Sequence, residues 1–391
     1  MDEAPHVLQL DRDGSAPANS PRIKELLLRD FRCYERARLA LGDGLTVIFG
    51  PNGAGKTNLL EAVYFGCTGR SCRAGNEREV VRFGAFSTRV VAAVCAQDGT
   101  HELAVGFAPG EPKRLLIDGA PAESLLDADA RPLLTVFLPE RLELIKGPPA
   151  VRRAHLDQLV AALWPARVGA RRAYAQTLAQ RNALIARIRA RGGSREALGA
   201  WDRQLAQHGI ALMADRAAAV EAIAATLADI AEKLGLGATA AVAYRPRSRA
   251  ASAEELADEI AARTDGDLER GFSGHGPHRD ELSLVRDGRE LRTYGSQGQQ
   301  RLTLLALLLA EREAIGRLRG SLPVLLLDDV MSELDQTRRR ALSTRLRTGG
   351  GQALVTASEL EHVPGGDAPD VLAVSVSANG TLETHGGPGP A

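Results

Sequence analysis

Residues 50–57 have the sequence Gly-Pro-Asn-Gly-Ala-Gly-Lys-Thr, and they separate two segments of different character. The run before them, Leu-Thr-Val-Ile-Phe at 45–49, is apolar and predicts a buried strand, whereas residues 58–65 predict a helix. A strand, a glycine-rich loop and a helix in this order are the context that a Walker A phosphate loop requires. The glycines let the backbone point N–H groups at an anion, and the helix N-terminus adds its dipole. We therefore expect the chain to bind a nucleoside triphosphate.

Two side chains at the end of this loop have predicted roles. Lys56 can reach the terminal phosphates, and the Thr57 hydroxyl can ligate Mg²⁺. A chance glycine-rich turn is the alternative, and the complete pattern in this context disfavours it. ATP and Mg²⁺ are thus the expected cofactors.

Residues 324–329, Val-Leu-Leu-Leu-Asp-Asp, predict a buried parallel strand that ends in two carboxylates, as in a Walker B motif. The carboxyl ends of parallel strands line the ligand crevice of such a sheet. Asp328 would hold Mg²⁺ through water, and Asp329 would orient or activate the attacking water. Taken alone, the pattern also fits a pair of loop carboxylates.

Residues 294–301, Tyr-Gly-Ser-Gln-Gly-Gln-Gln-Arg, precede an apolar helix predicted over 302–312. A serine at a helix start presents a hydroxyl and backbone N–H groups to an anion. The stretch is similar to the LSGGQ signature of ATP-binding-cassette ATPases, and the matching positions are Ser296, Gly298 and Gln299. Downstream, Ser-Glu-Leu-Asp at 332–335 matches the D-loop of the same ATPases.

The spacing of these motifs predicts the domain organisation. A compact cassette needs far fewer residues between Walker A and the signature than this chain has, so we expect an insertion between two flanks that fold together. The fold class is α/β: an ABC-type P-loop ATPase head, with a mixed sheet and helices, carrying an inserted α-helical arm. The predicted parts are a mobile N-terminal tail, the first part of the ATPase head, the inserted helical arm, the second part of the ATPase head and a C-terminal tail, at 1–20, 21–149, 150–265, 266–375 and 376–391.

The inserted arm is predicted from an alanine- and arginine-rich segment over 150–234. Its later part has an apolar seam that steps by three and four residues, at Val220, Ile223, Leu227, Ile230 and Leu234. An earlier helix supplies the candidate facing residues Leu178, Ile185 and Ile188, and glycines at 192–193 separate the two helices. We expect an antiparallel hairpin or small bundle, because a helix of about 40 residues reaches only roughly 60 Å.

The charge of the arm is uneven. Residues 151–200 contain ten arginines and only two acids, and Arg187, Arg191 and Arg195 are spaced four residues apart. This spacing fits either a solvated helix face or a patch that follows phosphates.

Global composition adds little, because the formal net charge is zero and the sequence pI is about 7.1. No apolar run approaches the roughly 20 residues of a membrane helix, and residues 1–20 lack the pattern of a signal peptide. None of the four cysteines belongs to a CxxC pair, which disfavours zinc and a disulfide framework. A cytoplasmic protein is therefore expected.

Ten segments together resemble the RecF recombination-mediator family, a short-armed relative of Rad50 and structural-maintenance-of-chromosomes heads. They include Phe-Arg-Cys-Tyr-Glu at 31–35 and Gly-Arg-Ser-Cys-Arg at 69–73, and the others lie at 50–65, 137–140, 146–149, 152–153, 156–157, 276–280, 294–301 and 325–335. The resemblance implies a two-lobed head and an ATP-driven two-fold dimer, in which Ser296 of each copy caps the γ-phosphate held by Lys56 of the other. It also implies a DNA clamp with weak, DNA-stimulated ATPase activity. Such a clamp acts in DNA repair and at replication forks, where it helps RecO and RecR to load the RecA recombinase at single-strand gaps and double-strand/single-strand junctions.

The resemblance and the motifs together predict the site residues. The catalytic set is Lys56, Asp329 and Ser296, and the metal ligands are Thr57 and Asp328. The nucleotide-binding set is Gly50, Pro51, Asn52, Gly53, Ala54, Gly55, Lys56, Thr57, Asn58, Gly298, Gln299, Ser332 and Asp335. Candidate contacts with double-stranded, gapped or single-stranded DNA are Arg73, Arg187 and Arg191; Arg73 equally fits a nucleotide contact or a plain surface position.

Some positions depart from the family pattern. Cys33 stands where asparagine is usual, Pro139-Glu140 occupies the expected Q-loop stretch, and Thr356 or Ser358 stands where a switch histidine is expected. The last departure suits slow hydrolysis. His278 and Arg279 lie in a tight Gly-Pro loop, for which we favour a structural role.

Two other functions fit parts of the pattern. The signature is also compatible with the motor subunit of a membrane transporter. Two features argue against this function: the arginine-rich insertion, and the Asp-Asp pair where transporters usually have Asp-Glu. A chromosome-structural protein with long coils is a further alternative, and the length of the arm argues against it.

Overall fold

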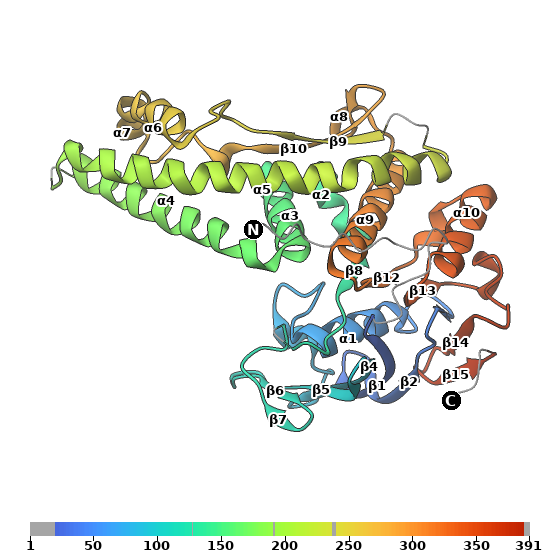
Figure 1. The fold of residues 1–391 in the computed structure, drawn as a ribbon. Coiled ribbons are helices and arrows are strands. Elements are labelled where there is room, and N and C mark those ends of the chain that lie inside the picture. Colours follow the sequence, from blue (N-terminus) through green and yellow to red (C-terminus); the bar gives the residue numbers. More distant parts are fainter. Residues whose placement is uncertain (1–19, 127, 191, 237–239, 387–391) are drawn as a thin grey trace, which may run out of the picture. The chain divides into compact units, whose positions relative to one another are not determined.

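The computed structural model describes residues 20–126, 128–190, 192–236 and 240–386. The chain forms two compact units (Figure 1). The first unit combines residues up to Glu140 with those from Ile315 onward, and the second unit runs from Arg141 to Ala314. Nearly all of the predicted N-terminal tail lies outside the described residues.

The first unit contains a six-stranded antiparallel sheet in the order β2-β1-β4-β5-β6-β7. The strands are β1 (Arg22–Phe31), β2 (Tyr34–Ala40), β4 (Thr88–Ala96), β5 (Gly99–Phe107), β6 (Arg114–Ile117) and β7 (Ala120–Pro121). Asp118 and Gly119 form the turn between β6 and β7, with φ angles of +51° and +80°.

A second six-stranded sheet in this unit has the order β15-β14-β3-β13-β12-β8. It consists of β3 (Leu45–Phe49), β8 (Leu134–Phe137), β12 (Val324–Leu327), β13 (Ala353–Ala357), β14 (Leu372–Val376) and β15 (Leu382–His385). All neighbouring strands are parallel except β14 and β15. The predicted mixed sheet is therefore confirmed, and it places the ends of β3, β13 and β12 side by side.

Helix α1 (Lys56–Thr68) contacts both sheets of the first unit. Leu59, Val63 and Phe65 are fully buried, and the Phe65 ring lies 5.5 Å from that of Phe31. Because both sides of α1 are covered, its apolar residues surround the helix instead of forming one stripe. The unit is completed by η1 (Glu77–Val80), η2 (Pro139–Leu142), η6 (Val330–Glu333), α10 (Gln336–Thr348) and η7 (Leu360–His362).

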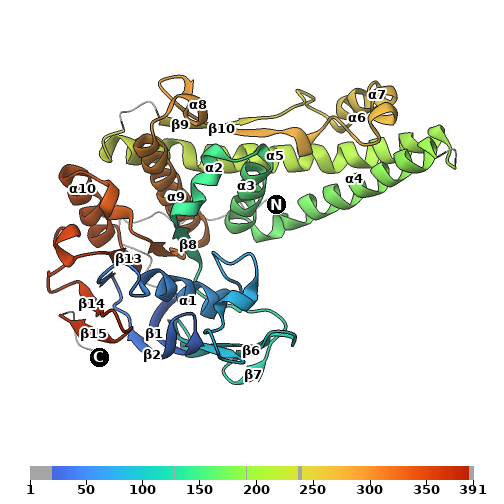
Figure 2. The same cartoon turned by 180° about the vertical axis from the view of Figure 1, so that it is seen from behind.

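The second unit is built on helices α4 (Val168–Arg189) and α5 (Leu198–Lys233), which run side by side (Figures 1 and 2). With its 36 residues, α5 is roughly 54 Å long. Ion pairs of 2.6 Å between Arg181 and Asp202 and of 3.1 Å between Arg167 and Asp215 show that the helices are antiparallel. The predicted helical hairpin is confirmed.

The partner predicted for the apolar seam of α5 is wrong. In the antiparallel register, Leu178 packs in the cluster that contains Leu205, so α4 covers only the earlier part of α5. The seam at 220–234 extends beyond α4, and the contacts of α5 with α3 (Pro149–Leu163) and β9 (Ala240–Arg245) explain its burial.

The remaining elements of the second unit include a three-stranded sheet in the order β11-β10-β9. They are α2 (Glu143–Lys146), η3 (Pro165–Arg167), η4 (Arg195–Ala197), α6 (Ala253–Ala261), α7 (Thr264–Arg270), η5 (Pro277–Arg279), β10 (Glu281–Arg286), β11 (Arg289–Glu290) and α8 (Leu291–Tyr294). Helix α9 (Gln297–Arg319) begins in this unit and ends in the first, and it extends beyond the predicted 302–312 at both ends.

The boundaries of the two units differ from those of the predicted domains. Strand β10 pairs with β9, and Arg152 of α3 forms a bidentate ion pair with Glu281 at 2.6 and 2.9 Å. These contacts join the segment from 266 to 314, which includes the signature stretch, to β9 and α3. The segment therefore belongs to the second unit, whereas we predicted that it folds with the phosphate loop.

The Gly-Pro-His-Arg-Asp loop at 276–280 is fixed by buried polar side chains. Arg216 donates to both carboxylate oxygens of Asp157, at 2.8 and 3.2 Å, and to Asp280 at 3.3 Å. The Tyr174 hydroxyl lies 2.7 Å from His278 Nδ1, and His278 Nε2 donates to the carbonyl oxygen of Ser273 at 2.9 Å. Burial lowers the pKa of His278 to about 4. These contacts support a structural role for the loop.

We expect His278 to make stability depend on pH. Its pKa is about 4 in the folded chain and near 6.5 when unfolded, so protons bind the unfolded chain first as the pH falls. Its contribution, about 3 kcal/mol, is fully present above pH 6.5 and is lost between about pH 6.5 and 4. Urea unfolding of the His278→Gln variant should show a flatter pH dependence over this range. The His208→Gln control should match the wild type, and equal curves for all three proteins would contradict the prediction.

Candidate nucleotide site

The phosphate loop joins β3 to α1 and depends on its glycines. Gly50, Gly53 and Gly55 have φ angles of +151°, +84° and +105°, in the region that favours glycine. A Cβ on Gly55 would lie 2.7 Å from both Cys33 Sγ and the Tyr34 hydroxyl. The turn between β1 and β2 therefore packs directly against the loop, and only glycine fits at the start of α1.

Lys56 is folded back onto this loop. Its Nζ donates to the carbonyl oxygens of Gly50 at 2.7 Å and Pro51 at 3.0 Å, and the residue is 8% exposed. Burial lowers the pKa of Lys56, and the carboxylates of Asp329 and Asp328 oppose this shift. The ammonium group is therefore held at the loop, next to the acids of the Walker B strand.

The Asp328 carboxylate joins three parts of the chain. Thr57 Oγ1 lies 2.9 Å from each of its oxygens, and Thr356 Oγ1 donates to Oδ1 at 2.7 Å. Asp328 is buried, which raises its pKa, and the two threonine hydrogen bonds oppose that shift. The parallel pairing of β3, β13 and β12 aligns the strand ends that carry these residues.

These donors fit a magnesium ion. Mg²⁺ takes hard oxygen ligands and is usually bound through one or two protein groups together with phosphates and water. Thr57 and Asp328 supply such oxygens, and Lys56 and the loop amides lie beside them. Among the described residues, no group of three or more His, Cys, Asp or Glu side chains could hold a metal by itself.

Asp329 differs from Asp328 in its surroundings. Its side chain is exposed, and its backbone has a φ angle of +46°, which is uncommon for a residue other than glycine. The Asp329 N–H donates to Thr356 Oγ1 at 2.9 Å. One threonine hydroxyl thus positions both acids, and Asp329 is left accessible for the water-orienting role that we predict.

Thr356 is the residue whose role sequence reasoning did not identify. We considered it as a substitute for a switch histidine, but it is fully buried and its hydroxyl is bonded to the Walker B segment. Ser358, the other candidate, has its hydroxyl 3.0 Å from His362 Nδ1. The side chains of Pro139 and Glu140, at the expected Q-loop position, lie outside the described part of the structure.

A buried ion pair that the sequence did not indicate joins α1 to the turn between β1 and β2. Glu61 is fully buried and accepts two hydrogen bonds of 2.8 Å from Arg32. Arg73 lies 3.8 Å from the same carboxylate and donates to Asn58 Oδ1 at 3.3 Å, and its charge opposes the rise in the pKa of Asp328. Arg73 therefore faces the nucleotide site, and a contact of Arg73 with DNA stays a prediction.

The signature residues lie in the second unit, at the start of α9. Ser296 Oγ accepts a hydrogen bond from the N–H of Gln299 at 3.3 Å, and Gln299 Oε1 accepts one from the N–H of Ser296 at 2.9 Å. This reciprocal capping box is predictable from the Ser-x-x-Gln spacing. Ser296 and Gly298 are exposed, so the helix N-terminus can meet an anion.

The D-loop residues have structural contacts within the first unit. Ser332 Oγ donates to the carbonyl oxygen of Asp329 at 2.9 Å, and Asp335 caps α10 by accepting from the N–H of Arg338 at 2.9 Å. Both residues are exposed. Their contact with a nucleotide stays a prediction.

The arginines of the arm do not share the predicted face. Helix α4 ends at Arg189, so Arg195 lies in η4, and Arg191 lies outside the described residues. Arg187 is exposed on α4. Acids of the same unit pair with several arginines of this window: Asp215 with Arg167, Asp157 with Arg171, Asp202 and Asp267 with Arg181, and Asp265 with Arg195.

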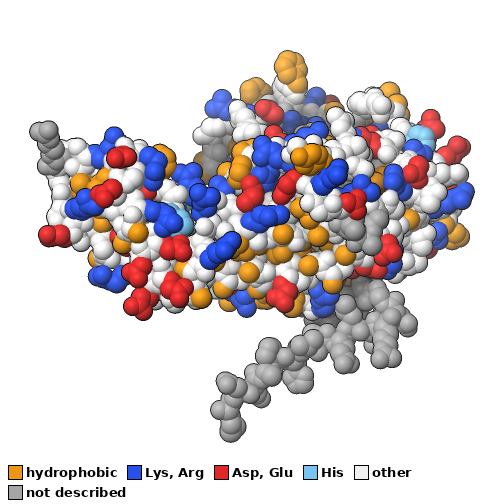
Figure 3. All heavy atoms as spheres, turned by 90° about the horizontal axis from the view of Figure 1, so that it is seen from above, with side chains coloured by type: hydrophobic (Ala, Val, Ile, Leu, Met, Phe, Trp, Pro, Cys, Tyr) orange, Lys and Arg blue, Asp and Glu red, His pale blue; other side chains and the backbone are white. Residues whose placement is uncertain are grey.

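Basic and acidic side chains are interspersed over the face shown in Figure 3. The excess of arginine in the sequence window is therefore partly neutralised by acids of the same unit, most of which lie later in the chain. Of the two arm residues predicted to contact DNA, Arg187 is the one that lies within the described residues.

Fold and site together define the head of an ABC-type P-loop ATPase. A family model described as an AAA domain matches residues 25–98. The Smc head domain of Pyrococcus furiosus, solved with an extended coiled coil and bound to the C-terminal domain of ScpA, has the same fold: 18% identity, a TM-score of 0.60, and coverage of 94% of this chain and 96% of that chain. None of the helices in the described part of this chain is long and apolar enough to cross a membrane.

More similar proteins define the family. The chain is 38% identical over 359 residues to the DNA replication and repair protein RecF of Anaeromyxobacter sp. (strain Fw109-5), covering 89% of this chain and 95% of that protein. It is 36% identical over 381 residues to RecF of Myxococcus xanthus (strain DK1622), with 94% and 96% covered. A solved structure of the recombination mediator protein RecF with ATP, in the RecFOR pathway, is 27% identical with a TM-score of 0.79, covering 94% of this chain and 98% of that chain. The chain belongs to the RecF family.

We expect Gly55→Ala to abolish nucleotide binding. The added methyl group would meet Cys33 and Tyr34 at 2.7 Å, and φ is +105°, so the loop must move. Gly53→Ala is the matched control: it has a positive φ of +84° but nothing within 4 Å of the new Cβ. Binding of a fluorescent ATP analogue should be lost in the first variant and reduced far less in the second, whereas equal affinities would refute the packing argument.

Removing the Thr356 hydroxyl should slow hydrolysis. Thr356→Val leaves the Asp329 N–H without its partner and Asp328 with one hydrogen bond fewer, which we expect to cost about 1–3 kcal/mol of stability. ATP turnover should fall at least tenfold, and Thr356→Ser, which keeps a hydroxyl, should restore most of it. Steady-state ATPase assays and thermal unfolding measure both effects. Wild-type turnover in the valine variant would contradict this role.

Proposed function

We propose that the protein is an ATP-dependent DNA-binding clamp with slow ATPase activity, which acts in DNA repair and replication. The observation that carries the proposal is the exposed N-terminus of α9 with Ser296, in a chain whose own phosphate loop lies in the other unit. A helix N-terminus of this kind binds anions. A second copy that supplies it to the phosphate site would make ATP the link between two protomers.

In this proposal each nucleotide site contains groups that bind the phosphates, groups that bind the metal ion and a group that orients water. Lys56 and the backbone of residues 50–58 hold the phosphates, and Thr57 and Asp328 hold Mg²⁺. The ion would neutralise charge on the phosphates. Asp329, exposed beside the buried acid, orients the water that attacks the γ-phosphate.

The dimer is proposed to be two-fold symmetric, so that each protomer gives the same surface to the other. Ser296, Gly298 and Gln299 of one copy would then contact the γ-phosphate bound to Lys56 of its partner, with Ser332 and Asp335 close to the interface. Hydrolysis would separate the two copies. The bonding of the Thr356 hydroxyl within the Walker B segment, where a switch histidine is expected, supports slow turnover.

The partners are proposed from the family. Relatives are named DNA replication and repair proteins, and the solved neighbours are named recombination mediators of the RecFOR pathway. We propose that this chain binds duplex and gapped DNA, meets RecR and RecO, and helps them to load RecA at single-strand gaps and junctions in the cytoplasm. DNA stimulates the ATPase, and Arg187, Arg191 and Arg73 contribute to DNA contacts.

The alternatives have less support. A transporter motor would not carry the α4–α5 hairpin, and membership of the RecF family argues against it. A chromosome-structural protein would need a coil far longer than α5, which is roughly 54 Å long with its 36 residues.

The test combines oligomeric state with DNA binding. In the wild type, light scattering should show a dimer that forms only with ATP. Binding to gapped DNA should depend on ATP in the same way. Ser296→Arg should bind ATP normally yet stay monomeric, because a bulky cation would fill the position of the γ-phosphate. Thr344→Arg, on the exposed face of α10, adds the same charge elsewhere and should dimerise. An ATP-dependent dimer of the Ser296 variant would refute the shared site.

A further inference from the structure

Four arginines form one row across the antiparallel sheet of the first unit. Arg36 of β2 lies opposite Arg29 of β1, and Arg29 lies opposite Arg89 of β4. Arg89 lies opposite Gly106 of β5, which lies opposite Arg114 of β6. Five strands at about 4.8 Å spacing make this row roughly 19 Å long.

All four arginines lie on the face that points away from α1. Residues directly opposite each other in a sheet share a face, and the alternate residues Leu28, Val90 and Val105 are buried in the core on the other side. The arginines themselves are exposed, and the Arg29 side chain is 70% exposed. We call them the arginine row.

Few acids lie near this row. Arg29 has a carboxylate oxygen of Asp30 at 3.9 Å, and Glu111 lines the adjoining groove. Among the described residues, no carboxylate lies within 4 Å of the charged nitrogens of Arg36, Arg89 or Arg114. Like charges directly opposite in a sheet are destabilising, so the free protein bears a cost that an anionic partner would relieve.

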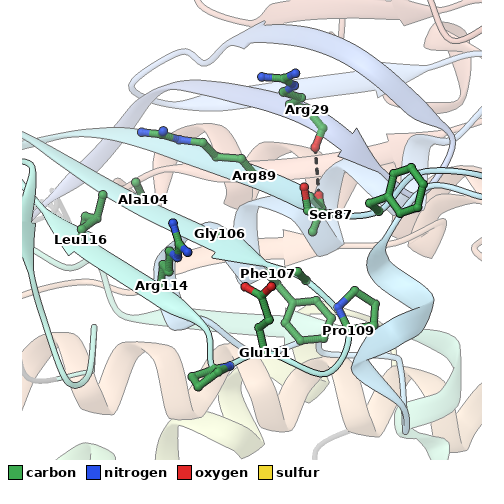
Figure 4. A pocket seen from close by; sticks show the side chains of 14 residues that line it. Arg29, Ser87, Arg89, Ala104, Gly106, Phe107, Pro109, Glu111, Arg114 and Leu116 are labelled. Carbon is green, nitrogen blue, oxygen red and sulfur yellow. Dashed lines mark hydrogen bonds between the residues drawn. The ribbon is translucent and has the colours of Figure 1, made fainter.

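A groove of about 740 Å³ begins at the arginine row. Figure 4 shows Arg29, Arg89 and Arg114 along one part of it and Phe107 and Pro109 at another. Phe86 also lines the groove and is 93% exposed, and Phe83 in the same loop is fully exposed. The groove thus combines a line of cations with unburied aromatic rings.

We propose that the arginine row and this groove bind a single strand of DNA, with phosphates along the row and an unpaired base stacked on Phe86. Arginines that follow a backbone and aromatic rings that stack on bases are the two elements of single-strand recognition. The linear arrangement fits a polyanionic chain better than a flat anionic surface. This inference rests on the proposed DNA-binding function and adds a binding surface in the first unit that is specific for single strands.

The first test removes the charge of the row. The triple variant Arg29→Gln/Arg89→Gln/Arg114→Gln should bind a labelled 30-nucleotide single strand at least tenfold more weakly by fluorescence anisotropy in moderate salt. Its dependence of log affinity on log salt should be shallower by about 2, because three phosphate contacts are lost. ATP binding should stay unchanged, which also checks folding.

The control variant removes the same charge elsewhere, as Arg203→Gln/Arg289→Gln/Arg340→Gln, from three exposed positions. It should bind like the wild type. Equal losses in both triple variants would mean a general charge effect and would overturn the proposal. So would a row variant that keeps its affinity for DNA and loses binding only to vesicles of anionic lipid.

The second test separates single strands from duplexes. Phe86→Ala removes an exposed ring and should weaken single-strand binding roughly tenfold, with less than a twofold effect on a duplex of the same length. An equal effect on both, or none, would overturn the stacking role. If the wild type binds no DNA with or without ATP, the proposed function fails; if it binds DNA and the row variant binds equally well, only this inference fails.

Discussion

The hydrogen bonds around Asp328 are the constraint on which the nucleotide site depends. One buried carboxylate accepts from Thr57, 271 positions earlier in the chain, and from Thr356, 28 positions later. These contacts fix the phosphate loop to the Walker B strand, and through Thr356 they also fix the backbone of Asp329. A buried carboxylate is costly unless its hydrogen bonds are satisfied, so the cluster tolerates little variation in strand register.

The sequence predicted those parts of the fold and site that depend on local pattern. The phosphate loop and the strand before Asp328 each follow from residues within a few positions of one another. The structure brings Lys56, Thr57 and Asp328 together as the motifs predicted. Their roles in catalysis are still predictions.

The features that were missed depend on contacts between distant residues. The pairing of Arg32 with Glu61 and the double role of Thr356 have no local signal. The seam of α5 was given the wrong partner because periodicity shows which face is apolar and does not show what covers it. The arginines of the arm looked unbalanced because their acidic partners lie up to 86 positions later, as with Arg181 and Asp267.

The division of the chain between the two units has a consequence for folding during synthesis. The second unit is continuous from Arg141 to Ala314, so all of its residues are made before the last fifth of the chain. Strand β3, in contrast, pairs with β13 and β14, more than 300 positions later. Because closing long loops slows folding, the ribosome should release a chain whose helical hairpin is already formed while its ATPase sheet still has exposed edges. We expect those edges to make the nascent first unit more prone to aggregation than the second.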